Sequence, residues 1–372
     1  MLYTSELTNS EIQRYSRQII LPEISVDGQI KIRNSKVLVV GLGGLGSPVV
    51  SYLATAGVGT LGLLDYDVVE FSNLQRQTIH SERTVSKDKT KSAFLHLKRL
   101  NSRITIREHS CMIGDDNANK IIAQYDIILD CCDNITSRYS INDNCKLLGK
   151  KYICASVLKW EGQIFVFADD GPCYRCLFPD PKNDNMLGCA ESGVLGPMCG
   201  VIGSLQAVEA LKLILDSCKS FLLTYNGYEN IFKKVEINQK SERCLVCTEK
   251  KIPPSNFGTC KNQIMRVSID DKYKIKWKDF LASPTQYLLV DIRNKILYDM
   301  CHIQNSVNVP ADTLDENNEI FKDKRKILFL CKKGISAQKV AAKFLEKGKN
   351  VFVVDGGLTK FKSEIDLNFP LV

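Results

Sequence analysis

The sequence predicts an α/β protein that has a doubly wound sheet in its first part and a second, smaller α/β domain after it. Three observations support this prediction. Strands and helices alternate between residues 36 and 157, a glycine-rich loop joins the first strand to the first helix, and short apolar strands recur beyond residue 265. Such alternation is typical of a sheet covered by helices on both faces. The 372 residues are enough for two domains.

The elements of the first domain follow from the apolar pattern. Residues 1–35 are expected to form a helical lead-in. The alternating elements that follow are a strand at 36–41, a helix from about Ser47 to near Gly57, a strand at 60–65, a helix at 87–100, and strands at 125–130 and 151–157. From Gly162, alternating apolar and polar residues predict another strand, then a helix at 203–217 and strands at 221–237. We therefore expect a mixed, Rossmann-like sheet.

A domain boundary is expected soon after Cys247. The segment that follows contains proline and glycine and shows no periodicity, which is typical of a linker. We divide the chain into a first domain at 1–250, a linker at 251–265 and a second domain at 266–372. The strands of the second domain are expected in the segments YLLVDIR, SVNVP, KILFLCKKG and NVFVVDGG.

The composition gives expectations about the cellular location of the protein and about its binding partners. Residues 1–23 carry charges unlike those of a signal peptide. No apolar run approaches the ~18–20 residues of a membrane helix, so we expect a cytoplasmic protein with no membrane association. Most of the net charge of +8 falls in residues 251–372. Either an acidic partner, such as a protein or RNA, or a solvated lysine-rich surface is consistent with this excess.

A nucleotide pocket is predicted at the first strand-to-helix loop. Gly41, Gly43 and Gly46 stand in G-x-G-x-x-G spacing, and the next strand ends at Asp65. Small residues admit phosphate close to the N–H groups at a helix start, and the carboxylate can bind ribose hydroxyls. This pattern alone would suit NAD and an oxidoreductase. The segment SNLQRQ at 72–77 adds an amide and a guanidinium, which favour a triphosphate.

Two C-x-x-C pairs predict a metal site. Cys173 and Cys176 form the first pair, and Cys244 and Cys247 form the second. A disulfide framework is not expected in a cytosolic chain, although its cysteines number 15. Two such pairs supply four thiolates for a tetrahedral zinc ion, whereas a single pair could be redox-active or accidental. With four protein ligands, the site is expected to support folding and to take no direct part in catalysis.

Cys331 is a candidate nucleophile. It ends the predicted strand KILFL and begins a loop that leads into a helix at 336–347. We expect backbone N–H groups at the helix start, together with Lys332 and Lys333, to favour its thiolate. A buried cysteine with no chemical role is the alternative.

Residues 11–247 resemble the adenylating domain of the MoeB and ThiF proteins and of ubiquitin-type activating enzymes. The resemblance rests on the glycine loop, SNLQRQ, Lys89 in SKDKTK, LDCCDN and Arg17 in RYSRQ. It implies a site for ATP and Mg²⁺ formed by Gly41, Gly43, Gly44, Gly46, Asp65, Ser72, Asn73, Leu74, Gln75, Arg76, Lys89, Asp133 and Asn134. Asp133 would assist the metal. Arg17 matches an arginine that this family donates from the neighbouring subunit, so a homodimer is implied.

The resemblance also assigns roles to cysteines. Cys189 matches the family cysteine that forms a covalent link with the C-terminus of the modified protein, and we assign the nearby Cys199 to packing against the helix that follows. Residues 266–372 resemble a rhodanese domain, with Cys331 at the persulfide-bearing position. The usual G-H-I-x-G-A is altered to Cys301–Ser306, and Ile335 replaces a residue that is often polar. These departures bear on which sulfur donor the domain would use.

Together the two resemblances imply an adenylyltransferase and sulfurtransferase. The first domain would adenylate the C-terminal glycine of a ubiquitin-like sulfur carrier that ends in Gly-Gly. Cys331, loaded by a cysteine desulfurase or another donor, would then supply sulfur for a C-terminal thiocarboxylate. Thiolation of tRNA wobble uridine, molybdenum cofactor biosynthesis, or both would lie downstream, with tRNA involved only indirectly, and protein modification stays open. The alternatives are a rhodanese domain that only docks partners and an RNA-binding C-terminal half.

Overall fold

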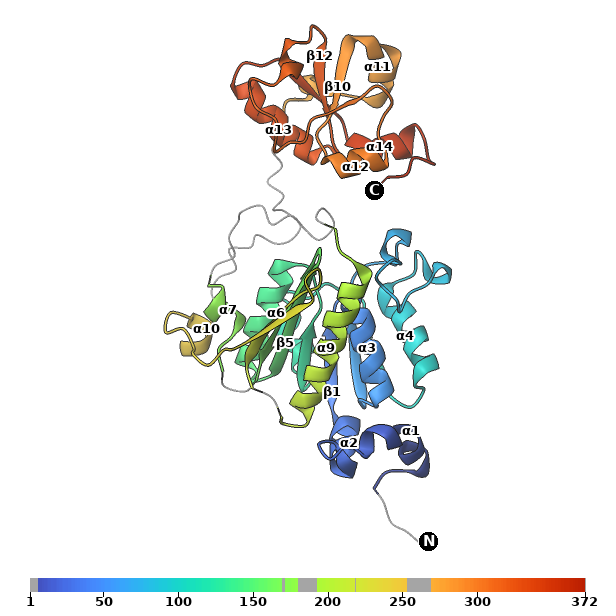
Figure 1. Ribbon diagram of the computed structural model, residues 1–372, viewed down its shortest axis with the longest axis vertical. Coiled ribbons are helices and arrows are strands. Elements are labelled where there is room, and N and C mark those ends of the chain that lie inside the picture. The colour runs from blue at the N-terminus through green and yellow to red at the C-terminus, as the bar shows by residue number, and fades with distance from the viewer. Residues whose placement is uncertain (1–5, 169–170, 180–192, 218, 253–268, 372) are drawn as a thin grey trace. The chain divides into compact units, whose positions relative to one another are not determined.

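The computed structural model describes residues 6–168, 171–179, 193–217, 219–252 and 269–371 (Figure 1). The chain divides into two compact units, Met1–Asn256 and Phe257–Val372, which are described separately below. Most of the expected linker at 251–265 lies outside the described residues, as does Cys189.

The first unit contains an eight-stranded sheet in the order β3-β2-β1-β4-β5-β6-β7-β8. Its parallel strands are β1 (Lys36–Val40), β2 (Thr60–Leu64), β3 (Thr105–His109), β4 (Ile127–Asp130) and β5 (Lys151–Leu158). Its antiparallel strands are β6 (Glu161–Phe167), β7 (Phe221–Asn226) and β8 (Ile231–Glu236). The strand order reverses between β1 and β4, and ligands of such sheets bind at the carboxyl ends of the strands beside that switch point.

Helices α3 (Gly46–Ala56), α4 (Lys89–Leu100), α6 (Ile135–Leu147) and α9 (Gly196–Ile214) pack on the strands of this sheet. The other described helices of this unit are α1 (Asn9–Ile19), α2 (Ser25–Asn34), α5 (Ala118–Ile122), α7 (Tyr174–Leu177) and α10 (Leu245–Thr248). Among the described helices, α9 alone is long and apolar enough to cross a membrane by length and composition. It packs against α3, β4, β5 and β6, so its place in the core explains its apolar composition.

The structure corrects several expected elements. The helix expected at 203–217 is α9 and begins seven residues earlier, at Gly196. Cys199 therefore lies inside this helix and does not precede it. The edge strand β3 and the helices α5 and α6 were not expected. The mixed, doubly wound sheet with a smaller α/β unit after it is confirmed.

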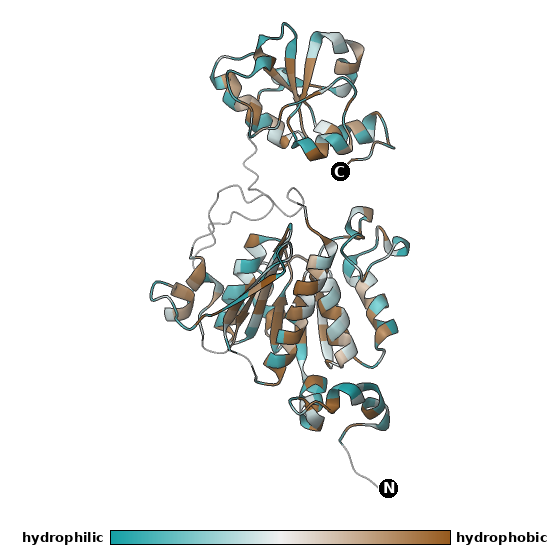
Figure 2. Ribbon diagram, viewed as in Figure 1, coloured by the Kyte–Doolittle hydropathy of each residue, from teal (hydrophilic) through white to brown (hydrophobic). Residues whose placement is uncertain are grey.

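The second unit contains a five-stranded parallel sheet in the order β11-β10-β12-β13-β9. The strands are β9 (Lys274–Ile275), β10 (Tyr287–Asp291), β11 (Val307–Asn308), β12 (Lys326–Leu330) and β13 (Val351–Val354). The helices are α11 (Trp277–Ala282), α12 (Lys295–Met300), α13 (Ile335–Glu346) and α14 (Gly357–Glu364). Apolar residues, brown in Figure 2, line the strands and the inner faces of these helices. Because β10 and β12 are parallel and Asp291 pairs with Leu330, Asp291 ends β10 and Cys331 follows β12 at the same edge of the sheet.

Candidate active sites and metal centre

Strand register brings together the residues predicted to bind a nucleotide. Val40, the last residue of β1, pairs with Leu64 of β2 and with Asp130 of β4. The residues that follow these three positions are Gly41, Asp65 and Cys131, which therefore meet at one edge of the sheet. This edge lies beside the switch point, where a doubly wound sheet binds its ligands.

The loop after β1 requires glycine. Gly41 has φ +93°, and a Cβ there would lie 2.8 Å from the carbonyl oxygen of Cys131. A Cβ on Gly46 would lie 2.0 Å from the oxygen of Gly41, and one on Gly44 would lie 2.7 Å from Cys199 Sγ. The loop is thus packed against β4 and α9 and leads directly into the N-terminus of α3, where backbone N–H groups favour an anion.

Asp65 fixes this loop to the second strand. Its Oδ2 accepts a hydrogen bond from the Leu42 N–H at 2.7 Å, and its Oδ1 accepts one from the Asp67 N–H at 2.9 Å. Burial raises the pKa of Asp65, although Lys89 and the two N–H groups oppose that effect. An ionised carboxylate has about four acceptor positions, so two are left for ligand hydroxyls.

Lys89 lies beside Asp65, at the start of α4. Its side chain is buried, and Nζ is 3.0 Å from Asp67 Oδ2. The sequence predicted a phosphate ligand here. In the structure Lys89 pairs with Asp67, which is half exposed, and the contact of Lys89 with phosphate stays a prediction.

The SNLQRQ segment packs on the glycine loop. A Cβ on Gly44 would lie 3.4 Å from Arg76 Cγ, and one on Gly43 would lie 3.6 Å from Gln77 Nε2. Arg76 also donates to the carbonyl of Ser72 at 3.3 Å. Arg76 is thereby placed next to the glycine loop. The predicted residues Ser72, Asn73, Leu74 and Gln75 lie on the turn between β2 and α4.

Asp133 and Asn134 follow β4 next to Gly41. Asp133 is exposed, and within the described part of the chain its side chain has no hydrogen bond or ion pair. Asn134 caps α6, because its Oδ1 accepts from the N–H groups of Thr136 and Ser137 at 2.9 and 3.3 Å. The carboxylate of Asp133 is therefore available to a ligand, whereas the carboxamide oxygen of Asn134 serves the helix.

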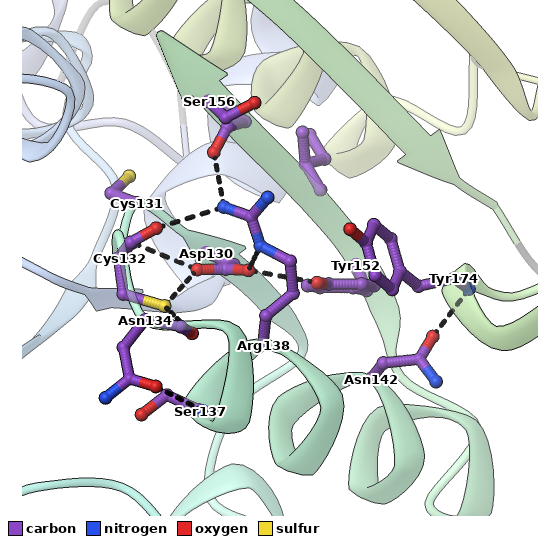
Figure 3. A network of polar contacts seen from close by, with 12 residues as sticks. Asp130, Cys131, Cys132, Asn134, Ser137, Arg138, Asn142, Tyr152, Ser156 and Tyr174 are labelled. Atoms are coloured by element: carbon purple, nitrogen blue, oxygen red, sulfur yellow. Dashed lines mark hydrogen bonds and ion pairs between the residues drawn. The ribbon is translucent and has the colours of Figure 1, made fainter. Parts of the chain in front are cut away.

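Two groups near the pocket were missed by sequence reasoning. His80 is buried, donates from Nε2 to the carbonyl of Leu42 at 3.0 Å and accepts at Nδ1 from Ser92 at 2.8 Å. Burial lowers the pKa of His80 to about 4, so the ring is neutral and supports the glycine loop. The second group is Arg138 of α6, which forms a buried ion pair with Asp130 (Figure 3). Neither residue belongs to a motif that would have marked it.

Arg17 lies at the other end of the sheet from this pocket. It is exposed on α1, and the adjacent Gln18 donates to the carbonyl of Ala56, at the C-terminal end of α3, at 2.8 Å. The glycine loop leads into the opposite end of α3, and 11 helical residues span about 16 Å. Figure 1 shows α1 and α2 beside the end of the sheet where β1 begins. The structure thus does not bring Arg17 to the pocket of its own chain.

The four cysteines of the two C-x-x-C pairs form one cluster. The Sγ separations are 3.9 Å for Cys173–Cys176, 3.6 Å for Cys173–Cys244 and 3.6 Å for Cys176–Cys247. Four sulfurs 2.3 Å from a tetrahedral zinc would be about 3.8 Å apart. The donor set and its spacing therefore fit zinc. All four atoms lie within 4.8 Å of one another.

Cys331 is the first residue of the loop that follows β12, and its side chain points into the fold. It is buried, and its Sγ accepts from the Ala337 N–H at 3.3 Å. Burial raises the pKa of Cys331, and the N–H groups of Ala337, Gly334, Lys333 and Ser336 oppose this only in part. Our expectation of a favoured thiolate is therefore wrong for the resting thiol. The side chains of Lys332 and Lys333 are exposed.

Asp291 and Arg293 lie at the end of the strand next to that loop. Arg293 donates to both oxygens of Asp291 at 2.7–3.0 Å and to the carbonyl of Cys301 at 2.6 Å. The Ile292 N–H, between them, donates to the carbonyl of Leu330 at 2.9 Å, one residue before Cys331. The side chains of the pair thus bond to Cys301, and the backbone of Ile292 bonds to the strand end next to the candidate nucleophile.

Comparisons with known proteins agree with both units. A family model described as ThiF family matches residues 15–246, and one described as Rhodanese-like domain matches residues 276–364. The Adenylyltransferase and sulfurtransferase MOCS3 of Xenopus laevis is 39% identical to this chain, and the match covers 99% of this chain and 90% of that protein. The protein of the same name from Danio rerio is 37% identical, with 98% and 88% covered.

Solved structures resemble the first unit. The crystal structure of E. coli MccB with MccA-N7isoASN is 25% identical, with a TM-score of 0.57, over 65% of this chain and 75% of that one. E. coli MccB with ATP has the same TM-score and coverage at 23% identity, which supports the fold alone. The nearly full-length relatives and the family model over residues 15–246 show that this chain belongs to the ThiF family, and a rhodanese-like domain follows the ThiF part.

Proposed function

We propose that this chain adenylates the C-terminal glycine of a ubiquitin-like sulfur carrier and then supplies the sulfur of a C-terminal thiocarboxylate. The observation that carries the proposal is the glycine loop packed against Asp65, Arg76 and the segment that bears Asp133, in a chain that also buries Cys331 at a helix start. The relatives named adenylyltransferase and sulfurtransferase support this pairing of activities.

The adenylation step is a displacement at phosphorus. A carboxylate oxygen of the carrier attacks the α-phosphorus of ATP, the bond to pyrophosphate breaks, and an acyl-adenylate forms. Most of the catalysis would come from positioning and charge neutralisation. Here the glycine loop holds the phosphates, Asp65 holds the ribose, and Asn73, Arg76 and Lys89 contact the phosphates. Asp133 would hold Mg²⁺, which supplies charge neutralisation at the phosphate oxygens.

The sulfur step uses Cys331. A donor such as a cysteine desulfurase loads Cys331 as a persulfide, and the outer sulfur attacks the activated carbonyl carbon of the carrier with loss of AMP. A second thiol then attacks the Cys331 sulfur of this acyl disulfide and the thiocarboxylate leaves. The disulfide that forms between Cys331 and the second thiol is reduced by a further thiol before the next turnover. We assign Cys189 a transient covalent link to the carrier and a part in this release.

Four further assignments belong to this proposal. The Cys173, Cys176, Cys244 and Cys247 cluster holds a structural zinc ion, which its sulfur spacing supports. The chain acts as a cytoplasmic homodimer, which the position of Arg17 supports. The thiocarboxylate serves tRNA thiolation, molybdenum cofactor biosynthesis, or both, and tRNA itself is not bound directly.

The experiment is to incubate the chain with ATP, Mg²⁺ and carriers that end in Gly-Gly. The mass of the intact carrier is then measured by mass spectrometry. Acyl-adenylate is expected without a sulfur donor and thiocarboxylate with one. Cys331→Ala is expected to retain carrier-dependent pyrophosphate exchange and to form no thiocarboxylate. Asp133→Ala is expected to lose exchange and to retain thiosulfate:cyanide sulfurtransferase turnover.

Two results would contradict the proposal. A chain that ignores ATP with Mg²⁺ but retains a dinucleotide coenzyme would be an oxidoreductase. A chain that adenylates the carrier, yet shows no persulfide on Cys331 by mass spectrometry and no sulfurtransferase turnover, would use its second unit only to dock partners.

A further inference from the structure

We propose that the buried ion pair of Asp130 and Arg138 positions Asp133 for adenylation, an inference that rests on the function proposed above. Asp130 is the last residue of β4 and is fully buried, and Arg138 lies one turn into α6 and is 7% exposed. Both side chains are too buried to contact a ligand directly. Their effect must therefore be exerted through the residues that they touch.

The pair holds the peptide groups of Cys132 from both sides (Figure 3). Asp130 Oδ1 accepts from the Cys132 N–H at 3.0 Å, and an amino group of the Arg138 guanidinium donates to the Cys132 carbonyl at 3.0 Å. The same amino group donates to the carbonyl of Ala155 on β5 at 2.8 Å. Arg138 Nε donates to Asp130 Oδ2 at 3.0 Å and closes the arrangement.

Residue 134 is fixed independently on the other side of Asp133. The side chain of Asn134 caps α6 through the N–H groups of Thr136 and Ser137. Asp133 is thus a single residue between two anchored neighbours, and its own carboxylate is exposed and has no partner within the described residues. Anchoring the backbone on both sides limits where that carboxylate can point, which is what a positioned ligand or catalytic group needs.

Stability alone does not account for this pair. Buried ion pairs are often no more stabilising than well-packed apolar residues of similar volume, because desolvation offsets the attraction between the charges. In this pair, both charged groups also bond to the backbone of the segment that carries Asp133. Tyr152 provides an internal comparison, because its hydroxyl donates to Asp130 Oδ2 at 3.1 Å and no bond joins its side chain to residues 131–134.

The experiment compares carrier-dependent pyrophosphate exchange by the full chain for wild type, Arg138→Lys and Tyr152→Phe. Lysine can pair with Asp130, but it lacks the planar fork that spans the carboxylate and the Cys132 carbonyl. Arg138→Lys is expected to lower kcat about 10- to 100-fold, as outer-shell partners of ligating groups do. The KM for ATP should change by less than about twofold, because binding and positioning are separable. The Mg²⁺ concentration for half-maximal exchange should rise.

Tyr152→Phe is the matched control. It removes one hydrogen bond to Asp130 and leaves the Cys132 contacts intact, so its melting temperature should fall while kcat stays within about twofold of wild type. If Arg138→Lys does not fold, Asp130→Asn combined with Arg138→Gln replaces it, because that double variant buries no unpaired charge.

The outcomes separate this inference from the proposed function. An active wild type with an equally active Arg138→Lys variant overturns the positioning role alone. Equal losses of kcat in Arg138→Lys and Tyr152→Phe, each in proportion to the loss of melting temperature, also overturn it by showing a merely structural effect. A wild type that shows no exchange with any Gly-Gly carrier overturns the proposed function, and the positioning role with it.

Discussion

At the scale of single residues, the chemistry of Cys331 depends on a balance between burial and backbone N–H groups. Burial is the larger influence and raises the pKa of the thiol. The N–H groups of Lys333, Gly334, Ser336 and Ala337 act in the opposite direction. Such converging N–H groups form an anion-binding cradle. We infer that the cradle serves the charged outer sulfur of a persulfide more than the resting thiol.

This balance predicts slow alkylation of Cys331 at neutral pH. Its pKa lies above the ordinary thiol value of 9.0, and only the thiolate reacts, so the rate with iodoacetamide should keep rising with pH beyond 9. The measurement is mass spectrometry of the Cys331 peptide across a pH series, with an unfolded sample as the reference. A rate that levels off below pH 8 would show that the N–H groups outweigh burial after all.

Residue positions were predictable where a motif states a steric requirement. Gly41 and Gly46 were assigned from spacing, and the structure shows that a Cβ at either position would collide with backbone atoms. Arg138 and His80 were not predicted, because each acts through backbone partners that only the fold brings near. Arg138, for example, bonds to the carbonyl of Ala155, 17 positions away in the sequence.

At the scale of elements, the start of α14 packs directly against the backbone of the Cys331 loop. Gly357 has φ +57°, and a Cβ there would lie 2.2 Å from the carbonyl oxygen of Cys331. The next N–H, that of Leu358, donates to the same oxygen at 3.0 Å. The glycine therefore lets two segments of backbone meet at the candidate nucleophile.

Gly357→Ala is expected to impair sulfur transfer selectively. The left-handed conformation costs a non-glycine residue about 1–2 kcal/mol, and the collision must also be relieved by moving the Cys331 loop. Thiosulfate:cyanide turnover should fall at least about tenfold, since small displacements of a reacting group carry such penalties. Pyrophosphate exchange at the first unit is the internal control and should be unchanged. Full sulfurtransferase activity in this variant would show that the loop tolerates the shift.

The cysteine cluster joins two short helices that are distant in sequence. Cys173 precedes α7 and Cys244 precedes α10, and each begins a turn in which the later cysteine donates its N–H to the carbonyl of the earlier one at 3.0 Å. Within this part of the fold, the buried contacts of the cluster are few: Cys173, Cys244 and Val246 form its core. A metal ion would therefore supply much of the local stability.

Cys244→Ser is accordingly expected to lose zinc and stability together. Zinc content, measured by atomic absorption, should fall from about one ion per chain. A loss of about 3 kcal/mol would lower Tm by roughly 6–12 °C. The comparison is Cys145→Ser, which changes a buried cysteine on α6 outside the cluster. This variant should retain the full zinc content of the protein. A folded Cys244→Ser variant with full zinc content would contradict the assignment of this cluster as a zinc site.

Elements were predictable where burial produced an apolar pattern, and were missed elsewhere. The edge strand β3 reads TIREH and is nowhere fully buried, so its sequence carries no strand signal. The start of α9 was misplaced because Gly196 and Pro197, which precede the expected helix, are typical of loops. In the fold Gly196 permits close packing, since a Cβ there would lie 2.5 Å from the backbone oxygen of Gln75.

At the scale of the whole molecule, each unit has its own hydrophobic core and its own candidate site at one edge of its sheet. Both edges lie at the carboxyl ends of parallel strands, which is where such sheets present their ligands. Because the units share one chain, an activated carrier and a persulfide would be held at a local concentration on the order of millimolar. The sequence predicted this division from the change in pattern after Cys247.

The position of Arg17 makes a prediction about assembly. Arg17 lies near the C-terminal end of α3, whereas the glycine loop precedes its N-terminal end. If Arg17 serves adenylation, it must therefore serve the pocket of a second copy. In a symmetric dimer the same surface is used twice, so each pocket would combine Asp133 of one protomer with Arg17 of the partner.

Co-expressing Arg17→Ala with Asp133→Ala tests this arrangement. Each variant alone should lose pyrophosphate exchange, because every pocket of its homodimer lacks one group. In a mixed dimer, one pocket carries both substitutions and the other carries neither. Random pairing should then restore about a quarter of the wild-type exchange per chain. Size-exclusion chromatography with light scattering verifies that dimers are present. A mixture no more active than its parents, despite dimers, would place Arg17 outside the reaction, because chains that exchange subunits must generate intact pockets if the residue acts across the interface.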